Sequence, residues 1–127
     1  FEPLETLRMV RKYAGRQTTV VYDPRPVYPL GVLQGIQQYP AVEDIAGEID
    51  RLTAMALAVP AAEIAMEAGD SKSANIALLG AFSQLPGAPL SREDLEKILT
   101  QRFKGAVLEV NQRAFAMGCK AAGKGAV

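Results

Sequence analysis

Two asparagine side chains stand out because each lies among apolar residues at helical spacing. Asn75 falls in the first turn of the apolar segment 73–82, and Asn111 lies on the apolar stripe of the last helical segment. The chemistry that a carboxamide offers is hydrogen bonding, to a backbone, a partner side chain or a cofactor. Because burying an amide without a partner costs about 1–3 kcal/mol, we expect both side chains to be hydrogen-bonded.

These amides and two nearby glycines allow different interpretations. Asn75 can bond to a neighbouring loop, cap its own helix or contact a cofactor in a functional cleft. The position of Asn111 favours a hydrogen bond between elements that fixes the last helix. Gly80 and Gly118 most simply permit close helix packing. Neither asparagine is expected to be a catalyst.

A charged pair follows the first candidate strand. Asp23 and Arg25 lie just past the carboxyl end of that strand, where open α/β sheets bind ligands. A guanidinium there can bind a carboxylate, a diphosphate or an acid of a partner protein. The surrounding surface loop is rich in proline, a common feature of docking elements, which favours partner contact over ligand contact. Tyr28 and Tyr39 are candidates to line that surface.

Several absences narrow the function classes. The sequence has no histidine, which removes the commonest general base and zinc ligand, so a self-sufficient hydrolase or a metal site is not expected. It contains neither GxGxxG nor GxxxxGK[ST]. Lys+Arg and Asp+Glu number 14 each, which disfavours nucleic acid and membrane surfaces as partners. The single cysteine, Cys119, is interpreted as an incidental thiol, and a reducing cytosol fits best.

The elements that position these residues follow from periodicity and from helix-breaking residues. We expect a helix over about 3–14, a strand over 18–22 and a proline-rich loop to Pro40. A helix over 41–52 and a strand over 54–59 complete a strand–helix–strand unit with parallel strands. Pro60 opens a short helix that Gly69 closes.

The remaining sequence is predicted to be helical. Ser71 or Ser73 is expected to cap a helix that runs to about Gln84, and Ser91 begins a capping box. A last helix follows Gly105. The inward faces are predicted to include Leu95, Ile98, Leu99, Val107, Val110, Ala114 and Phe115.

These elements predict a single α/β domain over 1–127, a partial Rossmann-like three-layer fold with a short parallel sheet and a helical C-terminal layer. Two parallel strands do not usually make a stable sheet alone. The chain also opens at Phe1 without an initiator methionine. We therefore expect that an upstream segment supplies further strands. Completion by neighbouring chains, including self-association through an unfinished sheet edge, is the alternative.

The order of several short motifs resembles a known family. Segments 1–7 (FEPLETL) and 39–40 (YP), then 68–81 (AGDSKSANIALLGA) and 111–118 (NQRAFAMG), are similar to the gamma-type domain of 2-oxoacid:ferredoxin oxidoreductases. The opening FEPLE is most similar to the small (beta) subunits of the indolepyruvate branch. The chain looks like the C-terminal portion of this domain, without its Gly-rich first strand-turn-helix. The family often has Asn-Thr or Asn-Ser where this chain has Tyr22-Asp23.

This resemblance implies a function that depends on partners. Such enzymes oxidatively decarboxylate a 2-oxoacid, here an aryl pyruvate such as indolepyruvate, on thiamine diphosphate. They pass electrons through iron–sulfur clusters to ferredoxin and transfer the acyl group to coenzyme A. The resemblance places these cofactors on a large catalytic subunit, so this chain alone binds none and is inactive. A non-catalytic α/β binding or assembly module that shares the fold is the alternative.

Overall fold

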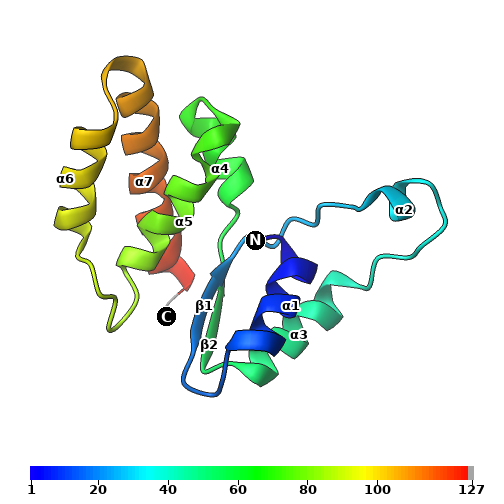
Figure 1. Cartoon of the computed structure of the whole chain (residues 1–127). Coiled ribbons are helices and arrows are strands. Elements are labelled where there is room, and N and C mark those ends of the chain that lie inside the picture. The colour runs from blue at the N-terminus through cyan, green and yellow to red at the C-terminus, as the bar shows by residue number, and fades with distance from the viewer. Residues whose placement is uncertain (126–127) are drawn as a thin grey trace. The chain divides into compact units, whose positions relative to one another are not determined.

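The computed structural model describes residues 1–125, with side chains described as far as residue 123 (Figure 1). The chain divides into a first compact unit, Phe1–Ala56, and a second that begins at Leu57. That residues 1–127 act as one domain stays a prediction.

The first unit opens with helix α1 (Pro3–Tyr13). Pro3 occupies the first helical position, where a backbone N–H would have no acceptor within the helix, so proline removes no hydrogen bond. The Glu2 carboxylate caps this end by accepting the Glu5 N–H. Arg11 and Lys12 lie in the last turn, where positive charge complements the helix dipole.

Strands β1 (Thr19–Tyr22) and β2 (Met55–Ala58) form a two-stranded parallel sheet. Helices α2 (Leu30–Leu33) and α3 (Val42–Leu52) lie between them in the sequence. Just before the strands, the Ala54 N–H donates to Thr18 O at 2.9 Å. The predicted α/β class with a short parallel sheet is confirmed.

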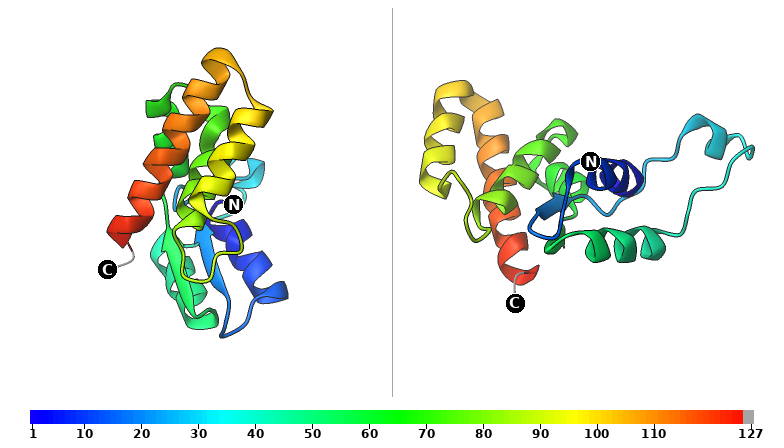
Figure 2. Two further views of the ribbon diagram at one scale, coloured as in Figure 1. Left: turned by 90° about the vertical axis from the view of Figure 1, so that its left-hand side faces the viewer. Right: turned by 60° about the horizontal axis from the view of Figure 1, so that its bottom comes forward.

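The core of the first unit forms where α1 and α3 pack side by side (Figures 1 and 2). Apolar residues of both helices pack with Tyr22 of β1, and Ile49 is fully buried. Its buried members are Leu7, Val10, Tyr22, Ile45 and Ile49. The helical spacing in α1 and α3 therefore predicts these faces correctly.

The segment from Asp23 to Pro40 was predicted to be irregular throughout, but it contains the single-turn helix α2. No residue in this segment is buried. Figures 1 and 2 show α2, in cyan, at the far end of a long loop that extends away from α1 and α3.

The second unit consists mainly of helices: α4 (Ala61–Ala68), the 3₁₀ turn η1 (Ser71–Ser73), α5 (Ala74–Ser83), α6 (Arg92–Arg102) and α7 (Gly105–Gly125). Its central contact is the pair α5 and α7. A buried cluster of Leu95, Leu99, Phe115 and Cys119 joins α6 to α7. Ser91 caps α6 by accepting the Asp94 N–H at 3.1 Å, as predicted.

Three details of the helical part differ from the sequence prediction. Asp70, rather than Ser71 or Ser73, provides the side-chain cap, because its Oδ1 accepts the Lys72 N–H at 2.9 Å. Ile98 and Val107 are 41% and 57% exposed, although their spacing suggested an inward position. Both lie at the margin of an apolar stripe, where periodicity does not separate covered from open positions.

Candidate functional site

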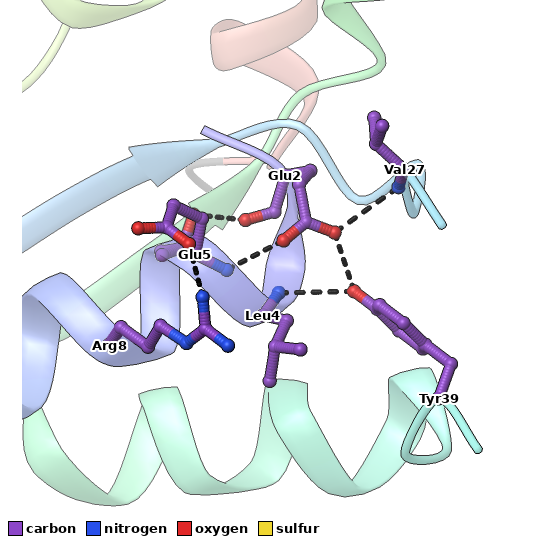
Figure 3. Close-up of polar contacts among 7 residues, drawn as sticks. Glu2, Leu4, Glu5, Arg8, Val27 and Tyr39 are labelled. Carbon is purple, nitrogen blue, oxygen red and sulfur yellow. Dashed lines mark hydrogen bonds and ion pairs between the residues drawn. The ribbon is translucent and has the colours of Figure 1, made fainter. Parts of the chain in front are cut away.

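The Glu2 carboxylate gathers three donors from three parts of the first unit (Figure 3). Its Oε1 accepts the Glu5 N–H at 2.6 Å. Its Oε2 accepts the Tyr39 hydroxyl at 2.6 Å and the Val27 N–H at 3.2 Å. We call Glu2, Val27 and Tyr39 the Glu2 clamp. It ties both ends of the exposed loop to the start of α1.

Tyr39 extends the clamp in two directions. Its oxygen also accepts the Leu4 N–H at 3.1 Å, and its ring meets Tyr28 edge-on with centroids 5.2 Å apart. Burial and the hydrogen bond to Glu2 raise the pKa of Tyr39 to about 12. Burial acts to raise the pKa of Glu2 as well, but the hydrogen bonds that it receives outweigh burial and lower it. At neutral pH the clamp is therefore a neutral phenol donating to a carboxylate.

The predicted pair Asp23 and Arg25 lies in a local turn. Asp23 Oδ1 accepts the Arg25 N–H at 2.9 Å, a side-chain turn that Asp favours, and the Asp23 N–H donates to Phe1 O at 3.1 Å. Arg25 is exposed. The structure thus gives Asp23 a turn-forming role, and ligand or partner contact by either residue stays a prediction.

Asn75 belongs to the second unit, and the burial expected for it is wrong. Its side chain is exposed, whereas Ala77, Gly80 and Ala81 form the buried face of α5. At 100° per residue, Asn75 lies on the opposite side of the helix from Ala77. An exposed amide is satisfied by water, so burial does not require a protein partner for it.

Asn111 is buried, 6% exposed, and both ends of its amide are bonded. Its Oδ1 accepts the Ser73 hydroxyl at 2.9 Å, and its Nδ2 donates to Val107 O at 3.0 Å. Two residues further along the chain, Arg113 donates through Nε and Nη2 to Ala68 O at 3.1 and 2.8 Å. These bonds join α7 to η1 and to the end of α4.

Replacing Asn111 with Leu is expected to lower the free energy of unfolding by about 1–3 kcal/mol, because the buried Ser73 hydroxyl loses its acceptor. Urea unfolding followed by far-UV circular dichroism measures this. In a double-mutant cycle, Ser73→Ala is expected to remove most of the added cost of Asn111→Leu. Fully additive effects contradict a shared bond.

Gly80 and Gly118 lie at the closest approach of α5 and α7. A Cβ on Gly80 meets the backbone carbonyl of Phe115, and one on Gly118 meets the backbone of Ala77. The two glycines therefore face backbone of the opposite helix rather than a ligand space. We propose that they act as packing residues.

Small surface hollows occur in both units. One of about 170 Å³ is lined by motif residues that include Gly69, Asp70, Ser73 and Asn111. Another of about 320 Å³ lies along α1 and β1 and is lined largely by apolar side chains such as Phe1. The buried polar side-chain atoms of Ser73 and Asn111, which line the first hollow, are already paired with each other.

The described part of the chain offers few side chains that could bind a metal together. Cys119 is buried, with its Sγ 3.6 Å from Ser83 Oγ. Within residues 1–125 there is no group of three or more His, Cys, Asp or Glu side chains that could hold a metal ion. In the same part of the chain, no helix is both long and apolar enough to cross a bilayer.

Sequence reasoning missed Glu2, Tyr39 as its partner, and Arg113 as positioning residues. Each lies inside one of the motif segments singled out from the sequence, namely 1–7, 39–40 and 111–118. The sequence feature that could have identified these residues is therefore their presence in the motif segments. In the structure, segments 1–7 and 39–40 are hydrogen-bonded to each other, and so are segments 68–81 and 111–118.

Comparisons with known proteins give matches that span these motif segments. The family model described as pyruvate ferredoxin/flavodoxin oxidoreductase matches residues 1–121. Indolepyruvate oxidoreductase subunit IorB of Thermococcus kodakarensis is 35% identical over 123 residues, which cover 96% of this chain and 60% of that protein. The Pyrococcus horikoshii subunit gives the same figures. The Archaeoglobus fulgidus subunit is 30% identical over 117 residues, covering 92% and 58%.

The chain thus spans about three fifths of the length of these curated relatives. No solved structure matches it.

Proposed function

Because this chain belongs to the pyruvate ferredoxin/flavodoxin oxidoreductase family, we propose that it works as part of the small subunit of a 2-oxoacid:ferredoxin oxidoreductase of the indolepyruvate type. The match over residues 1–121 is the observation that carries this proposal. The family predicted from the motifs is confirmed. Activity requires a large catalytic subunit.

The proposed reaction is the oxidative decarboxylation of an aryl pyruvate, with indolepyruvate as the first candidate from the names of the relatives. On the large subunit, thiamine diphosphate would stabilise the decarboxylated carbon, iron–sulfur clusters would carry electrons to ferredoxin, and coenzyme A would accept the acyl group.

The residues of this chain do not fit these cofactors. An iron–sulfur cluster usually takes four thiolates, whereas the only cysteine is buried. The described residues also lack a group of side chains for the metal that a diphosphate usually brings. We therefore assign the cofactors to the large subunit, and the role of this chain is to complete and position the complex.

Reconstitution tests the proposal directly. The chain, the large subunit from the same source and the combined complex are each assayed for 2-oxoacid-dependent dye reduction with a panel of aryl and alkyl 2-oxoacids. We expect turnover only in the complex, with aryl pyruvates preferred. Binding without turnover on any 2-oxoacid favours a non-catalytic assembly module instead.

Asn75→Ala is expected to leave the unfolding free energy of the chain within about 0.5 kcal/mol, because the side chain is exposed. If the Asn75 side chain contacts a cofactor or substrate held by the large subunit, as we propose, activity of the complex falls several-fold. Ser71→Ala, another exposed polar truncation nearby, is the control. Unchanged kcat/KM in both variants removes Asn75 from the site.

A further inference from the structure

A loop in the first unit exposes an unusual amount of apolar side chain. We call residues 26–40 the arm; α2 lies at its tip (Figure 2). Monomeric proteins rarely leave a contiguous apolar patch of more than a few hundred Å² uncovered. The arm carries five large exposed apolar residues: Val27 67%, Tyr28 48%, Leu30 67%, Leu33 70% and Ile36 76%.

The arm is also free of charge. The sequence has no charged residue between Arg25 and Glu43. A nucleic acid or an anionic membrane is bound mainly through Lys and Arg, so neither matches this surface. The surface that matches the arm is an uncharged apolar groove. When such a groove binds the arm and loses its water, no charged group is buried without a partner.

Hydrogen bonds fix both ends of the arm before any partner binds. Its first residues are tied through the Val27 N–H, and its last through the Tyr39 hydroxyl, to the single oxygen Glu2 Oε2. The edge-on contact of Tyr28 and Tyr39 closes the same end. The tip, by contrast, has no buried residue. Fixing the ends before binding reduces the entropy that a partner must offset.

We propose that the arm is a docking element that inserts α2 and its flanking apolar residues into an uncharged groove of the large subunit. This inference rests on the proposed function. A second copy of the chain is the less suitable occupant, because an arm that enters a different surface of an identical copy makes a head-to-tail contact. Such contacts form open filaments unless they close into a ring.

The test measures binding of the whole chain to the purified large subunit by biolayer interferometry. The double variant Leu33→Asp/Ile36→Asp places two charges at the tip without touching the Glu2 clamp. Met66→Asp, which alters a residue of α4 that is 65% exposed, is the matched control. We expect the Kd of the double variant to rise at least about 30-fold, as for a central interface residue, and that of the control to stay within about twofold.

The outcomes separate the two proposals. Equal Kd for wild type and the double variant overturns the arm inference and leaves the proposed function standing. Absence of wild-type binding overturns both. If light scattering shows a wild-type oligomer that the double variant dissociates, while affinity for the large subunit is unchanged, the arm docks to a second copy and the inference is wrong.

Discussion

Gly118→Ala is expected to lower the free energy of unfolding by about 3 kcal/mol or more, the upper end for overpacking a core. The added Cβ meets the oxygen, carbonyl carbon and Cα of Ala77, all of them backbone atoms of α5. A flexible side chain can move aside, but the backbone of a helix moves only if α5 and α7 separate. Separation exposes Ala77, Ala81 and Ala114, which are fully buried now.

The matched control is Gly123→Ala on the same helix, where a Cβ meets nothing within 4 Å. Alanine is the better helix former by about 1 kcal/mol, so this variant should be neutral or more stable. Urea unfolding by circular dichroism gives the free energies, and hydrogen exchange of α5 and α7 locates the loss. Equal stability of the two variants contradicts the packing role of Gly118.

The inward positions of Gly118 and Asn111 could be predicted from the sequence because both share one face of α7 with apolar neighbours. Their spacing on one helix is local information, and the partner helix follows from the need to cover that face. Asn75 shows where this reasoning stops. Helix α5 is apolar nearly all round, so its sequence does not indicate which side is covered, and Asn75 lies on the open side.

The Glu2 clamp could not be predicted for a different reason. Glu2 and Tyr39 are 37 residues apart and joined by a loop without a regular repeat. No local pattern fixes where such a loop returns. The parallel sheet, in contrast, follows from two short apolar strands around one amphipathic helix, since that connection leaves few alternatives.

Glu2→Ala is expected to lower the free energy of unfolding by about 3 kcal/mol, because one carboxylate both caps α1 and accepts two further hydrogen bonds. All four tyrosines lie within the first unit, so tyrosine fluorescence during urea unfolding reports on that unit. Glu5→Ala is the control. The Glu5 side chain is 44% exposed and pairs only with Arg8 at 2.9 Å among the described contacts, so its loss costs under about 1 kcal/mol.

The pH dependence of stability tests whether the charge of Glu2 matters. Its pKa in the folded chain lies below the ordinary value of 4.5, so its stabilisation is fully present above pH 4.5 and is lost as the pH falls through the lowered pKa. The pKa of Tyr39 is raised from 10 to about 12, so its contribution is present below pH 10 and is lost as the pH rises through 12. The stability difference between wild type and Glu2→Gln should therefore be constant from about pH 5 to 9 and shrink in acid. A difference that does not shrink in acid contradicts a role for the negative charge of Glu2 in holding the arm.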